Sequence, residues 1–372
     1  MFAPLRSFLH DRFLHLLLLL GILLAFWAPL PSAASLYHAV SWSTIATLAG
    51  LLILTRGIDD SGYFRVAGRR LVTRFHTQRT LALFLVAAAA LLASVLTNDV
   101  ALFITVPLTL SLRQYVSLPA NRLIIFEALA VNVGSLLTPI GNPQNIMLWQ
   151  QQGIGFWQFI GQMSALGVLL MLTLLILTWV CFASETLQVD EQTDSPEWHR
   201  PLLYCSVVMY LLFLVAVEMG QVYWGLLSVL LLFLLMGRKI LLTLDWSLLA
   251  VFIMMFVDVD LLTRLPQLRD MLAQVSHLSA LQQFLLSIGL SQVISNVPAT
   301  ILLSGTMGSS LLLAWGVNIG GFGLLPGSLA NLIALRMAKN SAIWWQFHLF
   351  SVPMLVWSVL FGGLLLSWLG HL

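Results

Sequence analysis

Long apolar stretches alternate with short polar connections along most of the chain. A helix needs about 20 apolar residues to cross the hydrocarbon core of a bilayer. Stretches of about this length recur throughout the sequence, and the candidate spans are 14–30, 42–58, 80–97, 100–117, 122–140, 157–183, 201–217, 222–236, 246–262, 280–294, 297–315, 317–335 and 346–370. The pattern predicts an all-α polytopic membrane protein.

Polar and helix-breaking residues interrupt the apolar sequence at two places. One is Thr97-Asn98-Asp99, and the other is Ser295-Asn296-Val297-Pro298. Backbone groups that such breaks free must find partners in protein or water, because lipid offers none. We therefore expect both breaks to face a polar cavity. We interpret 80–117 and 280–315 as re-entrant hairpins, and two full spans in place of each hairpin stay open as the alternative.

A second pattern relates the two halves of the chain. The residues Asn132-Val133-Gly134, Gly141-Asn142 and Asn145 recur 186 positions later as Asn318-Ile319-Gly320, Gly327-Ser328 and Asn331. Each copy follows one of the interrupted hairpins, and a Trp-Ser pair opens the first span of each half. An odd number of crossings per half inverts the second copy. The sequence thus predicts two inverted-topology repeats, with about nine crossings, two re-entrant hairpins and two interrupted helices.

The repeats divide the chain into four segments. An N-terminal span and external loop occupy 1–40, and the first repeat 41–183. An acidic linker with connecting helices occupies 184–245, and the second repeat 246–372. The basic, Leu-rich and then small-residue character of the first segment is also typical of a signal peptide, so cleavage of residues 1–34 stays open.

Composition and charge agree with a bilayer environment. The hydrophobic fraction is 59% and the charged fraction 9%, too few polar residues to cover a water-exposed surface. A net charge of +2 gives no basic footprint for nucleic acid. With the N-terminus inside, all of the 17 Lys and Arg residues except Arg264 and Arg269 lie on the cytoplasmic side. We therefore expect a cytoplasmic N-terminus and a periplasmic C-terminus.

The interruptions carry the candidate binding chemistry. An unwound helix exposes carbonyl oxygens at one half-helix end and N–H groups at the other, and Asn supplies both donor and acceptor. The candidate substrate- or ion-binding residues are Thr97, Asn98, Asp99, Asn132, Gly141, Asn142, Asn145, Ser295, Asn296, Asn318, Gly327, Ser328 and Asn331. The alternative is that these residues only cap half-helices or pack helices closely.

Ionisable residues within spans are costly and are candidates for function. Asp99 beside the first tip and Glu127 before Asn132 could carry a coupling proton. The alternative for Glu127 is an ion pair with Arg122 at the membrane edge. We expect no catalytic residue and no structural metal, because the two cysteines and scattered histidines lack a metal-site spacing and no catalytic motif is present.

At these motifs the chain resembles the ion transporter superfamily that includes citrate transporters, arsenite permeases, NhaD-type antiporters and divalent-anion/sodium symporters. The matching stretches are LTNDVALFITVPLTL, LLTPIGNPQNIML, SQVISNVPATILL and VNIGGFGLLPGSLANLIAL. The resemblance implies that Thr97-Asn98 and Ser295-Asn296 contact a substrate carboxylate, and that sodium binds near Gly141 and Gly327. The third tip position departs from the family's Ser-Asn-Thr signature, since the two halves have Asp99 and Val297 there.

Together these features predict a secondary transporter of the bacterial inner (plasma) membrane. It would carry a small anion or oxyanion by alternating access, without a cofactor and coupled to sodium or protons. The main alternative is a cation/proton antiporter of the NhaD type, and a channel or an intramembrane enzyme is less favoured because the sequence lacks a catalytic constellation and has two inverted halves. The expected partners are the lipid bilayer and a small-molecule or ion substrate, and a homodimer is left open.

Overall fold

The chain is built from helices. The computed structural model describes residues 8–9, 11–29, 32–187 and 198–372. Among these residues, an isolated bridge between Thr77 and Thr186 is the only β-type pairing, so the all-α prediction is confirmed. The described helices that are long and apolar enough to cross a membrane are Gln78–Val95, Phe156–Cys181, Arg200–Val217, Trp246–Thr263 and Ala342–Trp368. Residues 1–7, 10, 30–31 and 188–197 lie outside the described part, the last of these ranges within the predicted acidic linker segment.

Packing divides the chain into two compact units, and each unit draws on both halves of the sequence. Unit 1 comprises Met1–Ala67 and Asp194–Asp270, and unit 2 comprises Gly68–Thr193 and Met271–Leu372. The four predicted segments follow the order of the chain, whereas each unit joins parts of both predicted repeats. All of the candidate site residues lie in unit 2.

Unit 1 consists of α2 (Arg12–Trp27), α3 (Ala33–Ala39), α4 (Trp42–Asp60), α11 (Arg200–Glu218), α12 (Val222–Met236), α13 (Arg238–Leu242) and α14 (Trp246–Thr263). Helix α2 packs on α14, and α4 packs on α11 and α12. Two glycines allow the α4 contacts, because a Cβ at Gly50 would overlap the ring of Phe213 and one at Gly57 the ring of Phe233. Helices α5 (Tyr63–Arg74) and α15 (Pro266–Ala273) cross the boundary between the units.

The first repeat contributes five helices to unit 2, namely α6 (Gln78–Val95), α7 (Asn98–Leu112), α8 (Ala120–Ser135), α9 (Pro143–Gln152) and α10 (Phe156–Cys181). Helices α6 and α7 pack on one another and are joined by Leu96 and Thr97 alone, so they form a tight helical hairpin. Helix α8 ends at Ser135, and α9 begins at Pro143 after an irregular stretch. A helical hairpin and an interrupted helix are therefore both present in the first repeat.

The second repeat has the same order of elements, with η1 (Val275–His277), α16 (Ala280–Ile294), α17 (Asn296–Leu303), α18 (Ser310–Ile319), η2 (Leu325–Gly327), α19 (Leu329–Met337) and α20 (Ala342–Trp368). The predicted boundaries here were wrong. The hairpin consists of α16 and α17 and ends at Leu303, not at 315. The small, mostly polar residues 304–309 form an irregular segment between α17 and α18. The side chain of Ser309 caps α18 by accepting from Leu312 N, so α18 and α19 form the interrupted helix.

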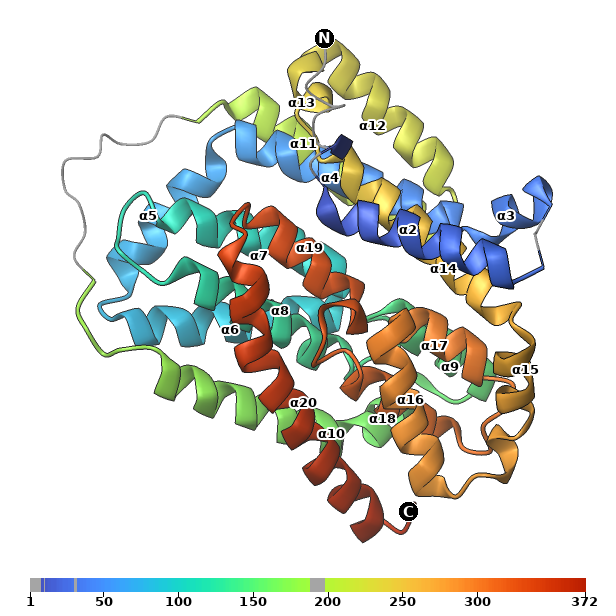
Figure 1. Ribbon diagram of the computed structural model, residues 1–372. Coiled ribbons are helices and arrows are strands. Elements are labelled where there is room, and N and C mark those ends of the chain that lie inside the picture. Colours follow the sequence, from blue (N-terminus) through green and yellow to red (C-terminus); the bar gives the residue numbers. More distant parts are fainter. Residues whose placement is uncertain (1–7, 10, 30–31, 188–197) are drawn as a thin grey trace. The chain divides into compact units, whose positions relative to one another are not determined.

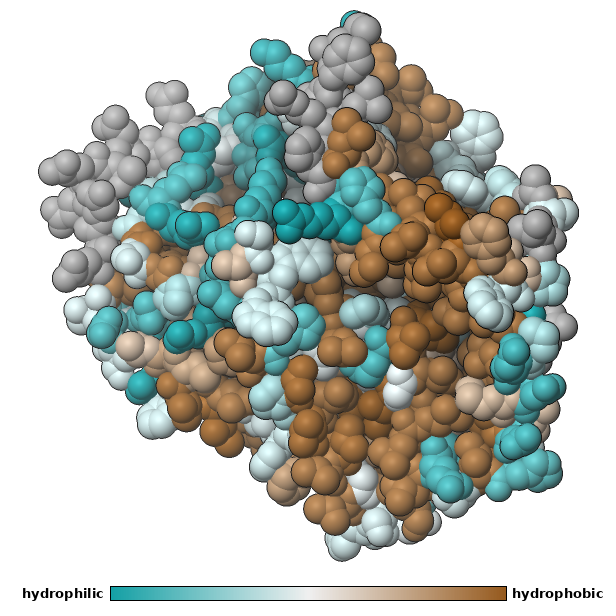
Figure 2. Space-filling model, in the orientation of Figure 1, coloured by the Kyte–Doolittle hydropathy of each residue, from teal (hydrophilic) through white to brown (hydrophobic). Residues whose placement is uncertain are grey.

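The interrupted helices interlock the two repeats. Helix α9 of the first repeat packs on α17 and α18 of the second, and α19 of the second packs on α7 and α8 of the first (Figure 1). Helix α20 packs on α8, α10 and α18, and Figure 2 shows hydrophobic side chains over the surface of α16 and α20. Residues far apart in sequence therefore meet inside unit 2 at the two helix interruptions.

Candidate functional site

Asparagines from the two interruptions bond to one another across the repeats. Asn132 Nδ2 donates to Asn331 Oδ1 at 2.8 Å, and Asn318 Nδ2 donates to Asn145 Oδ1 at 2.8 Å. These two bonds join equivalent pairs, because Asn318 is the counterpart of Asn132 and Asn331 that of Asn145. The sequence repeat therefore has a direct structural counterpart, a pair of quasi-symmetric amide bonds that links the halves.

Two further bonds follow the same symmetry. Ser328 Oγ donates to Asn132 Oδ1 at 3.0 Å, and Asn142 Nδ2 donates to Asn318 Oδ1 at 3.0 Å. All of these side chains are buried, with exposures of 4% or less. We call this set, Asn132, Asn142, Asn145, Asn318, Ser328 and Asn331, the amide cluster.

Most donors of the amide cluster are used within the protein. The second proton of Asn132 goes to Ala128 O and that of Asn318 to Ala314 O, at 3.1 and 2.8 Å. The Asn145 amide donates to the carbonyls of the broken segment after α8, and Asn142 Oδ1 caps α9 by accepting from Asn145 N at 2.9 Å. The amide cluster thus satisfies the backbone groups that the interruptions free, in line with the capping alternative for these residues.

Glycines permit this close approach in both repeats. A Cβ at Gly141 would overlap the carbonyl of Ser135, and one at Gly327 would overlap the carbonyl of Gly320. At Gly134 the obstacle is the carbonyl of Ala90 on α6. None of these glycines has a positive φ, so lack of space, and not an unusual backbone angle, excludes a side chain.

Each hairpin is hydrogen-bonded to the interruption of its own repeat. In the first repeat, Asn98 N donates to Gly141 O at 2.9 Å, and Thr138 Oγ1 donates to Ser94 O at 2.8 Å. In the second, Gln292 Nε2 donates to Gly320 O and Phe322 O at 2.7 and 3.0 Å. The hairpin tips are therefore held beside the amide cluster.

The tip asparagines differ from the amide cluster in having unused donors. Asn98 Oδ1 accepts from Asp99 N, and Asn296 Oδ1 accepts from Val297 N, both at 2.9 Å. Among the described residues neither Nδ2 group has an acceptor, although the exposures are only 5% and 3%. Both side chains lie at the first residue of a helix, where the positive end of the helix dipole favours an anion.

The neighbours of the tip asparagines have unlike roles. Thr97 Oγ1 caps α7 by accepting from Val100 N at 3.4 Å, a long bond. Ser295 is fully buried and has a φ of 73°, a conformation that side-chain-bearing residues rarely adopt. Such strained residues are concentrated at functional sites, and Ser295 lies directly before the predicted tip residue Asn296.

Glu127 on α8 is completely buried next to α7. Thr109 Oγ1 donates to Glu127 Oε1 at 2.6 Å, and Oε2 has no hydrogen-bond partner within the described residues. The alternative of a pair with Arg122 was wrong, because Arg122 Nη1 donates to Cys181 O at 2.7 Å instead. The counterpart of Glu127 in the second repeat is Leu313, so this carboxyl breaks the symmetry of unit 2.

Several polar partners escaped the sequence prediction. Ser135, Thr109 and Gln292 each bond a predicted residue or an interruption, and Gln144 Oε1 is buried without a partner. In unit 1, Asp258 is 3% exposed with neither oxygen bonded within the described part. The repeat could have pointed to Gln292, because it lies four positions before Asn296, as Ser94 lies four positions before Asn98. Both residues bond to the interruption of their own repeat.

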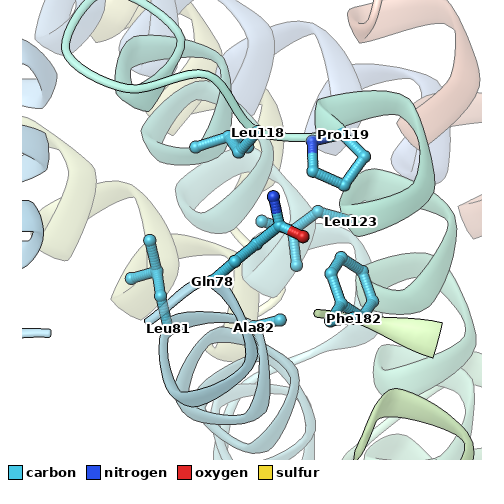
Figure 3. Close-up of a pocket in the computed structure, with 7 residues that line it drawn as sticks. All are labelled: Gln78, Leu81, Ala82, Leu118, Pro119, Leu123 and Phe182. Atoms are coloured by element: carbon cyan, nitrogen blue, oxygen red, sulfur yellow. The ribbon is translucent and has the colours of Figure 1, made fainter. Parts of the chain in front are cut away.

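Cavities and metal-binding groups add little to this site. A small cavity of about 10 Å³ has space for one water at most. Its lining residues, labelled in Figure 3, include none of the predicted residues. A second cavity, of about 460 Å³, lies where α7, α8 and α20 come together. In the described ranges, no three His, Cys, Asp or Glu residues are grouped so that they could hold a metal ion.

Two interlocked, interrupted helices with a hairpin beside each define a membrane transporter, and the comparisons agree with that class. Residues 13–311 match the citrate transporter family, and the chain belongs to this family. It is a multi-pass protein of the lipid bilayer.

Particular relatives cover most of the chain. It is 56% identical over 362 residues to the inner membrane protein YbiR of Escherichia coli, covering 97% of each chain. It is 32% identical over 335 residues to the uncharacterized transporter MJ0456 of Methanocaldococcus jannaschii, covering 89% and 91%. A shorter match of 29% over 166 residues, 43% of this chain and 34% of the other, links it to the silicon efflux transporter LSI3 of rice, Oryza sativa subsp. japonica.

Proposed function

We propose that this protein is a secondary transporter that moves a small anion or oxyanion across the inner membrane by alternating access. The observation that carries the proposal is the pair of buried tip amides, Asn98 and Asn296, whose Nδ2 groups have no acceptor within the described residues. Neither Nδ2 atom is among the fully enclosed polar atoms without a partner, so both amides can reach a ligand. Two such donors at helix N-termini are suited to bind carboxylate or oxyanion oxygens.

The comparisons support the same substrate class. The family takes its description from citrate, a carboxylate. Most donors of the amide cluster are used in bonds within the protein, and we assign the cluster to holding the two repeats in register. The binding role of the predicted residues then rests mainly on the tips, with Thr97 and Ser295 beside the asparagines.

Coupling to sodium or to protons completes the proposal. Two carboxyls are candidates, Asp99 at the first tip and Glu127 one helix away. Neither the Asp99 carboxyl nor Glu127 Oε2 has a hydrogen-bond or ion-pair partner in the described part of the chain. Sodium would use carbonyl oxygens near Gly141 and Gly327, the residues to which the family resemblance points.

A second candidate function is cation/proton antiport. It is favoured by the unpaired Asp99 carboxylate, which would repel a multiply charged anion and attract a cation. Under either function the cargo leaves chemically unchanged, so we expect transport without catalysis.

We also propose the topology predicted from charge, with the N-terminus in the cytoplasm and about nine crossings. Cysteine labelling from each side of the membrane tests it.

Reconstitution into proteoliposomes tests the leading function. Labelled citrate, silicate and phosphate are offered with an inward sodium or proton gradient, and both uptake and chemical identity are measured. We expect gradient-driven uptake of at least one anion, lost in Asn98→Ala and Asn296→Ala. Sodium-driven proton movement with no anion present would instead establish the antiporter.

A matched control separates binding from folding. Ser164 on α10 makes only a local bond to Gly161 O, so Ser164→Ala should transport like the unmodified protein. All variants must elute as a single peak in gel filtration. Full transport by both tip variants would overturn the assignment of the tips.

A further inference from the structure

The larger cavity of unit 2 has a lining unlike that of the amide cluster. It has a volume of about 460 Å³ and is formed by the end of α7, the connection to α8, the first turn of α8, the connection before α20 and the first turns of α20. Its lining residues are Arg113, Leu118, Pro119, Ala120, Asn121, Arg122, Asn340, Gln346, Leu349 and Phe350. The lining thus combines basic, amide and apolar side chains and contains no acidic residue.

The two arginines give the cavity an uncompensated positive charge. Neither Arg113 nor Arg122 forms one of the ion pairs found in the described residues, which join Arg56 and Arg264 to aspartates. Arg122 reaches the carbonyl of Cys181 with one nitrogen, which leaves its other donors available. The guanidinium of Arg113 has no hydrogen bond within the described part. Guanidinium groups are the preferred partners of phosphate and carboxylate oxygens.

Backbone groups add further donors at the same place. Helix α8 starts at Ala120 after Pro119, which provides no side-chain cap. Within the described residues, the N–H groups of Asn121 and Arg122 have no acceptor. Both residues line the cavity, and the positive end of a 16-residue helix lies there.

Three amide side chains of the lining form a chain of hydrogen bonds, and the last of them keeps a donor that is free within the described residues. Asn340 Nδ2 donates to Asn121 Oδ1, and Asn121 Nδ2 donates to Gln346 Oε1, each at 3.3 Å. The Nε2 group of Gln346 has no acceptor among the described residues. Guanidinium, backbone and amide donors therefore surround this cavity, and together they match an anion that has several oxygens.

The apolar part of the lining continues onto the outer face of α20. Leu349 lines the cavity and is 64% exposed, and Val352, Val356 and Leu360 follow at helical spacing with exposures of 37%, 53% and 58%. This stripe is about 16 Å long at 1.5 Å per residue, comparable to an acyl chain. The neighbouring Trp345 is 79% exposed, and exposed tryptophans at span ends are typical of the headgroup level of a bilayer.

We propose that this cavity binds the phosphate-bearing headgroup of an anionic phospholipid, with an acyl chain along the exposed stripe of α20. The charge calls for an anion, and the continuous apolar stripe calls for a hydrocarbon chain attached to it. A free anion would contact the basic and amide groups but not the apolar stripe of α20. The site is separate from the hairpin tips, and basic clefts between spans at the membrane surface are suited to such lipids.

Lipid titration of the purified full-length protein in mild detergent tests the proposal. Native mass spectrometry counts bound phosphatidylglycerol, and thermal unfolding reports its affinity, with phosphatidylcholine and inorganic phosphate as separate arms. We expect phosphatidylglycerol alone to stabilise. Arg113→Gln should weaken phosphatidylglycerol binding roughly fivefold and the double variant with Arg122→Gln roughly 25-fold, at about fivefold for each arginine near the surface.

Arg74 supplies the control, because it is exposed, lies in unit 2 and is not part of the cavity lining. Arg74→Gln should bind phosphatidylglycerol like the unmodified protein. The single variant keeps the test decisive if loss of the Arg122 contact to Cys181 impairs folding. Equal binding of phosphatidylcholine would overturn headgroup recognition, and equal stabilisation by inorganic phosphate would show a free-anion site in place of a lipid site.

Discussion

Replacement of Asn145 by alanine is the sharpest test of the amide cluster. The Asn145 side chain is fully buried and has four hydrogen-bonded partners. Its amide nitrogen donates to the carbonyls of Ser135, Leu136 and Thr138 at 3.2, 3.1 and 3.0 Å, and its oxygen accepts from Asn318. Alanine would leave all four partners without this bond.

The expected loss follows from that count. At about 1 kcal/mol for each hydrogen bond lost, Asn145→Ala should lower the free energy of unfolding by about 4 kcal/mol. Its symmetry counterpart Asn331 has two side-chain partners, Asn132 Nδ2 and Gly321 O. Asn331→Ala should therefore cost about 2 kcal/mol, half as much although the two positions are equivalent in sequence.

Equilibrium unfolding in mixed detergent micelles, followed by tryptophan fluorescence, measures both losses. Asn98→Ala is the matched comparison, because its side chain accepts only from the next residue, Asp99 N. It should change stability by less than about 1 kcal/mol and yet abolish transport. If Asn145→Ala and Asn331→Ala proved equally costly, or if Asn98→Ala proved the most destabilising, the division into a structural cluster and binding tips would be refuted.

Further substitutions test other parts of the structure. Glu127→Gln keeps the shape of the side chain but removes its charge, so the pH profile of transport should change while substrate affinity is kept; an unaltered profile would leave Glu127 a purely structural role. Gly134→Ala should destabilise by about 2 kcal/mol, because the Cβ would overlap the backbone of Ala90, whereas Gly161→Ala, with open space around it, should be neutral or slightly stabilising in urea or thermal unfolding. Ser295→Gly should raise the unfolding free energy by about 1 kcal/mol through relief of a positive φ, and a lowered midpoint would argue against strain at this tip.

Much of the fold follows from local features of the sequence. Apolar runs of membrane length give the long helices such as α10 and α20, since burial in lipid requires every backbone group to bond within its own helix. The interruptions at Thr97 and Ser295 were visible for the same reason, because polar residues and a following proline are costly inside an apolar run. The repeat of Asn132 and Asn318 also predicted that the two halves have equivalent parts.

The second hairpin shows where such local reading fails. Residues 297–315 read as one apolar span, but α17 ends at Leu303 and α18 begins at Ser310. A short run of small polar residues ends a helix only if the backbone N–H and C=O groups that are freed find other hydrogen-bond partners. That choice is made by the packing of α17 and α18 against α9, which lies far away in the sequence.

Residue identity shows that Asn132, Asn145, Asn318 and Asn331 are polar groups placed inside apolar helices, and that such groups must find partners there. Only the tertiary structure decides which partners they find. Bonds across the repeats and to nearby carbonyls give the amide nitrogen of each of these four residues at least one acceptor, whereas those of Asn98 and Asn296 have none in the described part of the chain. The physical reason is that hydrogen bonding is pairwise and short in range, so the free donors are known only once every neighbour has been placed.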